Sequence, residues 1–380
     1  MPQPYSARSR AIEPFHVMAL LARANELQAA GHDVIHLEIG EPDFTTAEPI
    51  IKAGQAALAA GKTRYTAARG LPELREAISG FYAQRYGVNV DPGRILITPG
   101  GSGALLLAAS LLVDPGKHWL LADPGYPCNR HFLRLVEGAA QLVPVGPDVR
   151  YQLTADLVAQ HWNEDSVGAL VASPANPTGT LLHRDELAAL SASLKARDGH
   201  LVVDEIYHGL TYGTDASSVL EVDNDAFVLN SFSKYFGMTG WRLGWLVAPE
   251  AAVGDLEKLA QNLYISAPSM AQSAALACFE PQPWRSSNNV EPSLPAVVIS
   301  CFRRCANWVS TLPWNRKAPS IYTQTSAHSA VMRLRSAITF WKPSTSRSHP
   351  GWISVATAPA ITCASPTPRA CLGFRKRSSE

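Results

Sequence analysis

The chain lacks the long apolar runs, the dense cysteines and the one-sided charge that mark three common classes of protein. No stretch of its 380 residues approaches the roughly 20 apolar residues of a membrane-spanning helix, so we expect no membrane partner. Six cysteines in this length do not make a disulfide framework, which favours a cytoplasmic location. The formal net charge is only +1, which argues against a nucleic-acid-binding protein.

The small net charge hides a sharp change of composition at Glu280. Residues 281–380 contain no Asp and two Glu against thirteen Lys and Arg, which gives them +11 and leaves −10 for residues 1–280. The same 100 residues hold five of the nine Trp and only two of the 26 Gly. One evolved fold rarely changes so sharply, and a basic tail that contacts nucleic acid is the first interpretation.

Residues 1–280 alternate short apolar runs with helical patterns. The runs are 94–98, 119–122, 167–172, 201–203, 227–229 and 243–247, and the helical patterns include 15–30, 71–86, 104–112 and 186–195. Buried apolar strands that alternate with helices predict an α/β fold with a mostly parallel sheet. Ligands of such sheets bind at the carboxyl ends of the strands, so we expect the chemistry in the residues that follow each run.

A glycine-rich stretch, Gly100 to Gly103, follows the first run and opens a helix. The free N–H groups and the dipole of a helix start suit a phosphate, although such turns are as often purely structural. The stretch is not a dinucleotide-binding fingerprint, because Leu106 occupies the position of the last glycine.

Lys234 follows the fifth run in the sequence Ser231-Phe232-Ser233-Lys234. A lysine that forms a Schiff base is a standard device of amine chemistry, whereas a lone lysine is ordinarily a solvated surface residue. The same four residues match the S-x-x-K pattern of penicillin-binding enzymes, which is a serine-nucleophile alternative. That class also needs a K-T-G triplet, which the chain does not contain.

Four more polar residues lie in the segments that follow these runs. Asp204 ends an apolar run, and a buried carboxylate needs a partner such as a protonated ring nitrogen or a structural arginine. Arg242 suits a phosphate, and Asn176 and Tyr207 suit hydrogen bonds, although each residue alone has a structural explanation. A Schiff-base lysine, an anion site, an arginine, a carboxylate, a phenol and an amide in one sheet are together the groups that pyridoxal phosphate requires.

On these residues the chain resembles the class I/II aminotransferases of the fold-type-I pyridoxal-phosphate superfamily, from about residue 35 to 280. The motifs are Gly40-Glu41-Pro42-Asp43-Phe44, Tyr65 to Gly70, Pro124-Gly125-Tyr126-Pro127, Asn176-Pro177-Thr178-Gly179, Asp204-Glu205-x-Tyr207 and Ser231-x-Ser233-Lys234 with Arg242. The resemblance implies a large domain (45–280) with a mostly parallel seven-stranded sheet flanked by helices. It also implies a small α/β domain, built in part from an N-terminal arm and helix (1–44) and incomplete here because of the anomalous tail (281–380).

The resemblance assigns roles to individual positions. Lys234 would carry the cofactor as a Schiff base and act in catalysis with Asp204, which pairs with the pyridine nitrogen, and Tyr207. Asn176 and Tyr207 would contact the ring hydroxyl, and Tyr126 would stack on the ring. The phosphate would be held by Ser102, Gly103, Ala104, Ser231, Ser233 and Arg242. Tyr65 would reach the phosphate of a neighbouring subunit, which implies a homodimer, and Gly40 and Asn176 would lie against the substrate.

The implied function is transfer of an amino group between an L-amino acid and a 2-oxo acid with ping-pong kinetics. The amine of Lys234, once displaced by the substrate, would carry a proton from the α-carbon, and a near-neutral pKa would favour this. A pyridoxal-phosphate-dependent C–S lyase is the nearest alternative, and a cofactor-binding remnant without activity is another. We expect no metal, and the sequence does not identify the amino donor.

The tail lacks the arginine with which the family binds the substrate carboxylate, in a pattern such as H-V-R-F-S-Y. In another reading frame, degenerate codons permit family-like sequence in three stretches in the right order: 288–309, E-G-A-F-Y from 317 and H-V-R-F-S-Y within 361–368. We therefore interpret residues from about 281 onward as a frameshifted translation rather than a nucleic-acid-binding tail. The tail is then expected to pack poorly, and the chain to keep its cofactor residues with little or no transaminase activity.

Overall fold

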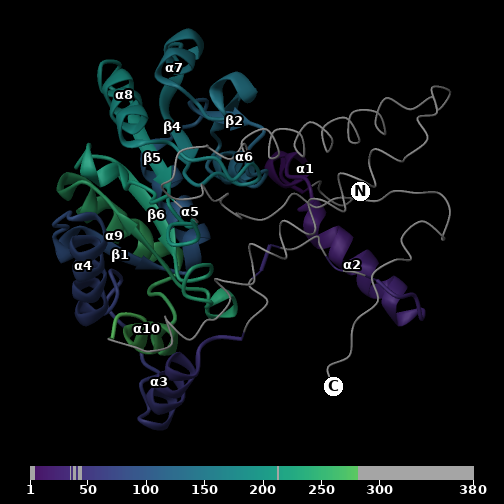
Figure 1. The fold of residues 1–380 in the computed structure, drawn as a ribbon, viewed down its shortest axis with the longest axis vertical. Helices are drawn as coiled ribbons and strands as arrows, with labels where there is room; N and C mark the ends of the chain where they lie inside the picture. Colours follow the sequence, from purple (N-terminus) through teal and green to yellow (C-terminus); the bar gives the residue numbers. More distant parts are fainter. Residues whose placement is uncertain (1–4, 35, 37–39, 42–44, 212–213, 281–380) are drawn as a thin grey trace, which may run out of the picture. The chain divides into compact units, whose positions relative to one another are not determined.

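Seven strands form one sheet, in the order β1-β7-β6-β5-β4-β2-β3 (Figure 1). The strands are β1 (Ile95–Thr98), β2 (His118–Asp123), β3 (Ala139–Pro144), β4 (Ser166–Ala172), β5 (His200–Asp204), β6 (Phe227–Ser231) and β7 (Gly244–Val247). β7 is antiparallel to both of its neighbours, and the other four pairings are parallel. The prediction of a mostly parallel seven-stranded sheet is confirmed.

The computed structural model describes residues 5–34, 36, 40–41, 45–211 and 214–280. Nearly all of them belong to one unit of the chain, which the sheet organises. No helix in the described part is long and apolar enough to cross a membrane. The expectation that residues 281–380 pack poorly lies outside the described residues.

Ten α-helices and five short 3-10 turns occur in the described part of the chain. The helices are α1 (Ala7–Ala11), α2 (His16–Ala29), α3 (Glu48–Ala59), α4 (Pro72–Tyr86), α5 (Gly100–Leu112), α6 (Asn129–Leu135), α7 (Ala155–His161), α8 (Arg184–Lys195), α9 (Glu250–Leu263) and α10 (Ser269–Ala275). The 3-10 turns are η1 (Pro92–Arg94), η2 (Pro147–Val149), η3 (Val219–Glu221), η4 (Thr239–Trp241) and η5 (Leu276–Cys278).

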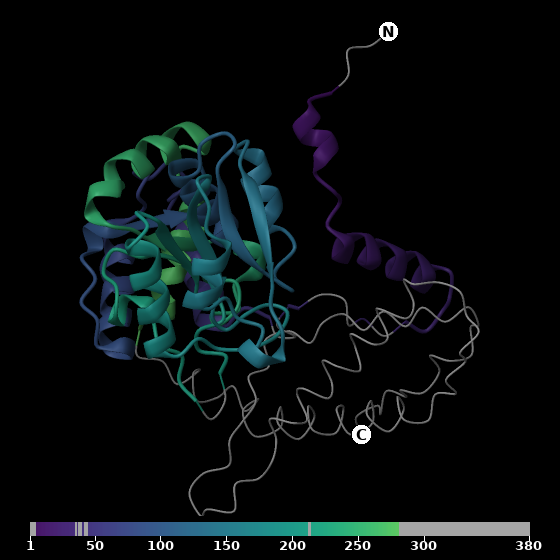
Figure 2. The ribbon, with the colours of Figure 1, turned by 90° about the horizontal axis from the view of Figure 1, so that it is seen from above.

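Helices cover both faces of the sheet (Figure 2). α5 packs on β1, β6 and β7 and against its neighbours α6 and α9. α8 packs on β5 beside α7, and α4 packs on β1, on the opposite face from α5. The result is a three-layer α/β arrangement, in which α-helices connect β1 to β2, β2 to β3, β3 to β4 and β4 to β5, whereas β5 and β6 are joined through η3.

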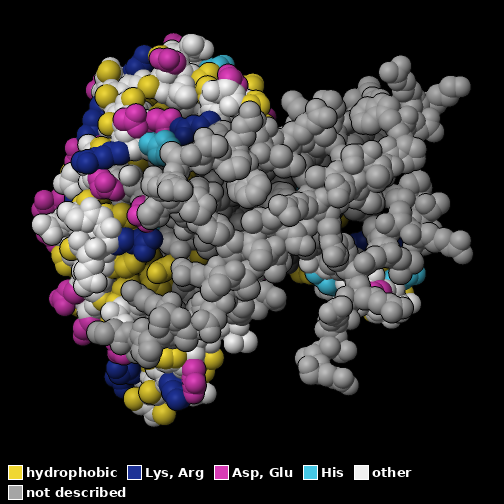
Figure 3. All heavy atoms as spheres, in the orientation of Figure 1, with side chains coloured by type: hydrophobic (Ala, Val, Ile, Leu, Met, Phe, Trp, Pro, Cys, Tyr) yellow, Lys and Arg dark blue, Asp and Glu magenta, His cyan; other side chains and the backbone are white. Residues whose placement is uncertain are grey.

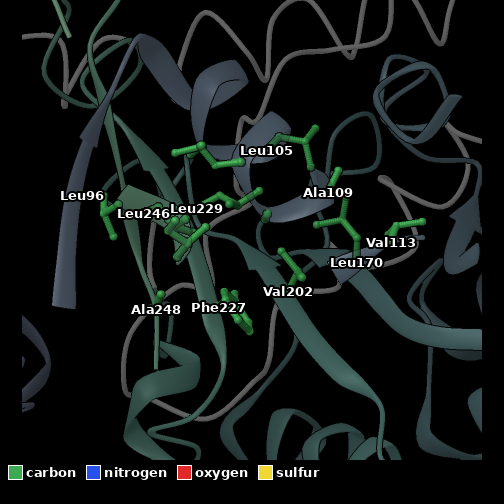
Figure 4. Packing of buried hydrophobic residues seen from close by; sticks show 14 of the residues in the cluster. Leu96, Leu105, Ala109, Val113, Leu170, Val202, Phe227, Leu229, Leu246 and Ala248 are labelled. Atoms are coloured by element: carbon green, nitrogen blue, oxygen red, sulfur yellow. The ribbon is translucent and has the colours of Figure 1, made fainter. Parts of the chain in front are cut away.

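Alternate strand positions supply the core beneath α5 (Figure 4). Leu96, Leu246 and Leu229 are cross-strand partners on β1, β7 and β6, and none is more than 2% exposed. Leu105 and Ala109 of α5 belong to the same buried cluster. Burial of one leucine stabilises a fold by roughly 1.5–3 kcal/mol, so this layer holds the start of α5 firmly at the edge of the sheet.

β3 is the strand that the apolar runs did not indicate. It lies at the edge of the sheet, and Val143 is its only fully buried side chain. An edge strand with one half-exposed face has too few apolar residues to form a run. The other six strands match the predicted runs to within two residues at each end.

The surface of the described residues carries both signs of charge. On the face seen in Figure 3, the Lys and Arg side chains lie interspersed with the Asp and Glu side chains. Strong phosphate-backbone binding needs basic side chains gathered in a patch or stripe. The visible described surface therefore does not have that pattern.

Candidate active site

The carboxyl ends of six strands lie along one edge of the sheet, because β1, β2, β3, β4, β5 and β6 run in the same direction. β7 runs the opposite way and begins at this edge. The topology brings most of the predicted site residues to this edge: the start of α5, Tyr126, Asn176, Asp204, Tyr207, Ser231, Ser233, Lys234 and Arg242. The chemistry expected from the sequence therefore lies where parallel sheets bind ligands.

Glycine shapes the start of α5 into a site for an anion. Gly100 has a φ of +71°, and a Cβ there would lie 2.5 Å from Nη2 of Arg242. A Cβ on Gly103 would lie 2.8 Å from Cδ of Pro99. The first N–H groups of a helix have no acceptor within the helix, so this turn presents donors beside a guanidinium group.

Two further predicted residues belong to the same first turn of α5. Ser102 is exposed and Ala104 is fully buried. Ala104 can therefore contact a ligand only through its backbone, whereas Ser102 can also offer its hydroxyl group.

The end of β6 adds two serine hydroxyls to this corner. Ser231 Oγ donates to Ser233 Oγ at 2.9 Å, and the Ser233 N–H donates to Ser231 Oγ at 3.0 Å. Arg242 Nη1 lies 3.4 Å from Ser233 Oγ. A Cβ on Gly101 would lie 3.7 Å from Cβ of Ser231, so the serines and the arginine converge on the start of α5.

Asp204 is the last residue of β5, and its strand register places it on the face that α5 covers. Oδ1 accepts a hydrogen bond from the Ile206 N–H at 3.0 Å. Within the described residues, no Lys, Arg or His forms an ion pair with Asp204. Burial raises the pKa of this carboxyl to about 6, and a cationic partner would lower it again.

Asn176 and Tyr207 come together although they follow different strands. Asn176 Nδ2 donates to the Tyr207 hydroxyl at 3.3 Å, and Tyr207 is only 6% exposed. An amide and a phenol at this spacing can both hydrogen-bond to one ligand oxygen.

The loop that carries Asn176 is held by a residue that the sequence did not single out. Gln152 is 3% exposed, and its Nε2 donates to the carbonyl oxygens of Ala172, at 3.1 Å, and Thr180, at 2.9 Å. The side chain thus ties the two ends of the loop together. No local motif marks a single glutamine as such a tie, since its partners lie 20 and 28 residues away.

Lys234 points to the N-terminal motif. Its Nζ donates to the carbonyl oxygen of Gly40 at 2.5 Å. Burial lowers the pKa of the amine, the charge of nearby Glu41 opposes this shift and Arg242 adds to it. A half-buried amine near a guanidinium group gives up its proton more readily than a surface lysine does.

Tyr126 follows β2 and faces the same corner. Burial raises the pKa of its phenol, and Tyr207 and Asp204 lie close enough to add to that shift. Its ring lies 6.0 Å, centroid to centroid, from the ring of Phe15, at 75°. Tyr126 and Asn176 also line a hollow at this edge of the sheet.

Tyr65 is the predicted residue that stands apart. It lies between α3 and α4, is 77% exposed, and shows no hydrogen bond or ring contact with the other described site residues. No group of three or more His, Cys, Asp and Glu in the described part of the chain could hold a metal ion.

Known proteins are similar to this chain in sequence. The family model for "Aminotransferase class I and II" matches residues 32–293. A valine–pyruvate aminotransferase of Mycobacterium tuberculosis is 40% identical over 273 residues, which cover 71% of this chain and 70% of that protein. An aspartate aminotransferase of Geobacillus stearothermophilus is 32% identical over 277 residues, 72% of this chain and 70% of that protein.

Solved structures share the fold. The crystal structure of an aminotransferase from Mycobacterium tuberculosis superposes with a TM-score of 0.71 at 40% identity and covers 73% of this chain and 72% of its own. The aspartate aminotransferase of Thermus thermophilus with maleate gives 0.71 at 29% identity, with 81% and 79% covered. The chain therefore belongs to the class I and II aminotransferase family, fold-type-I enzymes that use pyridoxal 5′-phosphate to transfer amino groups.

Proposed function

We propose that this chain holds pyridoxal 5′-phosphate at Lys234 and serves as a transaminase of amino acids and 2-oxo acids. The observation that carries the proposal is Asp204, a carboxyl that burial keeps at a pKa of about 6. It lies on the α5 face of the sheet, at the edge where Lys234 and the start of α5 also lie. A protonated pyridine nitrogen is the partner that such a group lacks.

The phosphate end of the cofactor fits the corner between α5 and β6. The backbone N–H groups of Ser102, Gly103 and Ala104 and the side chains of Ser231, Ser233 and Arg242 are the proposed donors. The support is the close approach of Gly100 to Arg242, since a Cβ at position 100 would touch the guanidinium group. Several N–H and O–H donors and one guanidinium group match the charge and the oxygens of a phosphate.

The ring end fits the side chains that follow β2, β4 and β5. Asp204 would keep the ring nitrogen protonated, Asn176 and Tyr207 would hydrogen-bond the ring hydroxyl, and Tyr126 would lie on the ring. The support is that Asn176 and Tyr207 already share one hydrogen bond. Asp204 and Tyr207 also lie near enough to Tyr126 to add to the rise that burial causes in the pKa of its phenol. These contacts would fix the ring so that one face meets the substrate.

When bound, pyridoxal phosphate withdraws electrons from the α-carbon of the amino acid and keeps the amino group between the two halves of a ping-pong cycle. Nζ of Lys234 is the proposed base that takes the proton from that carbon. Burial lowers the pKa of this amine, which favours its neutral form near pH 7. Tyr207 and Asp204 are proposed to act by holding the ring, and Gly40 and Asn176 are the proposed contacts of the substrate.

We also propose a homodimer in the cytoplasm. The support is that Tyr65 is 77% exposed, and so accessible to a second copy, and that the apolar side chains Leu58 and Ile265 are about half exposed. Exposed large apolar side chains together are typical of interaction surfaces. The low cysteine content supports the cytoplasmic location.

The domain boundaries at 44 and 280 and the frameshifted origin of residues 281–380 belong to the proposal. Their support is the change of charge at Glu280 and the family match, which ends at residue 293. On this account the arginine that would bind the substrate carboxylate is missing. Sequencing of the gene around the codon for Glu280 tests it, and an uninterrupted frame identical to that of related genes would contradict it.

The function is tested by mixing the purified chain with pyridoxal phosphate and recording the absorbance with and without amino donors. Relatives named for valine with pyruvate and for aspartate suggest these donors for the first screen. We expect a visible band that depends on Lys234. A spectrum identical to that of free cofactor, or to that of the Lys234→Ala variant, would contradict the proposal.

A further inference from the structure

The turn that follows β5 has two sides. Asp204 and Tyr207 belong to the proposed cofactor site, whereas their neighbours Glu205 and His208 are 0% and 4% exposed. Successive side chains on an extended strand point to opposite faces. Asp204 lies on the α5 face. Burial, and after it the nearby Glu205, raises the pKa of Tyr82 and Tyr86 of α4, which covers the other face.

One carboxyl group joins this turn to a distant segment. Glu205 Oε1 accepts hydrogen bonds from Ser218 Oγ and from the Val219 N–H, both at 2.9 Å, and Oε2 lies 3.1 Å from Ser218 Oγ. The Glu205 N–H donates to the Leu229 carbonyl at 2.9 Å. Glu205 therefore fixes the end of β5 to both the start of η3 and the neighbouring strand β6.

His208 completes the buried side of the turn. Its N–H donates to the Glu205 carbonyl at 2.9 Å, and its Nδ1 lies 2.8 Å from the hydroxyl of Tyr86. Burial raises the pKa of Glu205 to about 8 and lowers that of His208 to about 3, so both groups are largely uncharged near pH 7. Asp204 is then the residue of the 204–208 turn that would bring a charge to the cofactor ring.

The position of Asp204 in the turn depends on these bonds of Glu205. The side chain of Asp204 accepts a hydrogen bond from the Ile206 N–H at 3.0 Å, and its backbone carbonyl oxygen accepts one from the Ser173 N–H at 3.1 Å. Both bonds need the backbone of the turn in one conformation. Without the carboxyl group of Glu205, the Ser218 hydroxyl and the Val219 N–H would lose a buried acceptor, which destabilises this conformation.

We infer that Glu205 is a positioning residue, which holds the 204–208 turn from behind so that Asp204 and Tyr207 meet the cofactor ring. The inference rests on the proposed function, and it assigns a role to a residue that touches neither cofactor nor substrate. A carboxyl group suits the task because its two oxygens satisfy donors from a segment 13 and 14 residues away.

Four variants of the full chain test the inference. Glu205→Leu removes both acceptors at similar size, and Glu205→Gln keeps one acceptor oxygen. His118→Leu is the matched control, because His118 is 9% exposed and bonds Ser166 Oγ at 2.8 Å at the opposite edge of the sheet. Ser218→Ala, which removes one donor, replaces Glu205→Leu if the latter does not fold.

The first measurement needs no cofactor. Hydrogen–deuterium exchange at the Ile206 amide reports its bond to Asp204 directly. We expect E205L to speed this exchange at least about tenfold relative to H118L, with E205Q between E205L and the unmodified chain and S218A in the same direction. Equal Ile206 exchange in E205L and H118L would overturn the inference, whatever the chain does with pyridoxal phosphate.

The second measurement follows the pH midpoint of the absorbance change of the bound cofactor. We expect E205L to shift this midpoint by more than roughly half a pH unit and H118L to leave it unchanged, since only the former moves Asp204. An identical midpoint in E205L and the unmodified chain would also overturn the inference. Failure of the unmodified chain to show a Lys234-dependent band would count against the proposed function alone, because the exchange result still decides the role of Glu205.

Discussion

Residues 1–280 and residues 281–380 differ in charge, in composition and in family likeness. The first region carries −10 and nearly all the glycines, and the family match lies almost wholly within it. The second carries +11, has no Asp, and extends 87 residues past the end of that match at residue 293. All the residues proposed to hold the cofactor lie in the first region, whereas the arginine expected to bind the substrate carboxylate has no counterpart in the second. The comparison separates cofactor binding from substrate binding along one chain.

The largest expected effect concerns Lys234, on the cofactor side of the comparison. Lys234→Ala should abolish the cofactor band, since the amine is the proposed point of attachment. In a chain that turns over substrate, the loss of this base alone should lower the rate about 10²- to 10⁴-fold. Absorbance and single-turnover rates with an amino donor measure the two effects. A band that survives in Lys234→Ala would place the attachment elsewhere.

Restoring the family reading frame after Glu280 tests the other side of the comparison. A buried charge pair that loses one partner costs about 2–5 kcal/mol, so the frame-restored chain should transaminate about 30- to 4,000-fold faster than the present one. Steady-state rates at equal cofactor occupancy give the ratio. Equal rates in the two chains would show that the second region contributes nothing to substrate binding.

Asp204→Asn should show a pH-dependent gain in stability in the cofactor-free chain. Burial raises the pKa of Asp204 to about 6, whereas an exposed aspartate titrates near 3.9, so the folded state holds this proton more tightly. The stability that Asp204 contributes is present below about pH 4 and is lost as the pH rises through about 6. The variant should therefore be more stable than the unmodified chain by roughly 1–3 kcal/mol at pH 8 and by little at pH 4.

Denaturant unfolding at the two pH values measures this difference. Pyridoxal phosphate should abolish the advantage of the variant, because a protonated ring nitrogen would stabilise the Asp204 carboxylate. The same gain at pH 4 and pH 8 would mean that charge burial is not its cause.

Gly100→Ala should give a smaller effect, confined to the phosphate corner. Gly61 and Gly100 both have positive φ, so alanine is strained at either position, but only the Cβ at 100 would also touch Arg242. We expect Gly100→Ala to cost about 1 kcal/mol more in unfolding free energy than Gly61→Ala and to weaken cofactor binding as well. Calorimetric titration with pyridoxal phosphate provides the comparison, and equal affinities would argue against a phosphate at this corner.

Removal of residues 281–380 should have the smallest effect on cofactor binding. On the present account the second region adds nothing to the site at the sheet edge, so a chain that ends at Glu280 should show the same cofactor band and affinity. A truncated chain that folds but has lost the band would show that residues 281–380 contribute to cofactor binding.

The sequence predicted the sheet where burial imposes an apolar run. Six strands have such runs, whereas β3 has a half-exposed face and only Val143 fully buried, so its pattern was too weak. The site residues were predictable for a related reason, because the carboxyl end of each strand fixes where the next polar residue lies. Their contacts across strands, such as that of Asn176 with Tyr207, needed the fold.

Residues that act through distant partners could not be predicted. Gln152 ties the Asn176 loop by bonds to positions 20 and 28 residues away, and Glu205 anchors its turn through Ser218 and Val219. Glu205 lies within the Asp204-Glu205-x-Tyr207 motif, yet nothing in the neighbouring sequence indicates which face of the sheet its side chain occupies. Such roles depend on contacts that form only in the folded chain.

The most direct test of the central claim is reduction of the chain with borohydride in the presence of pyridoxal phosphate, followed by mass spectrometry of its peptides. The account predicts a reduced cofactor adduct on the peptide that contains Lys234, in the chain as written and equally in the chain that ends at Glu280. An unmodified Lys234 peptide, or an adduct spread over surface lysines such as Lys52 and Lys258, would contradict it.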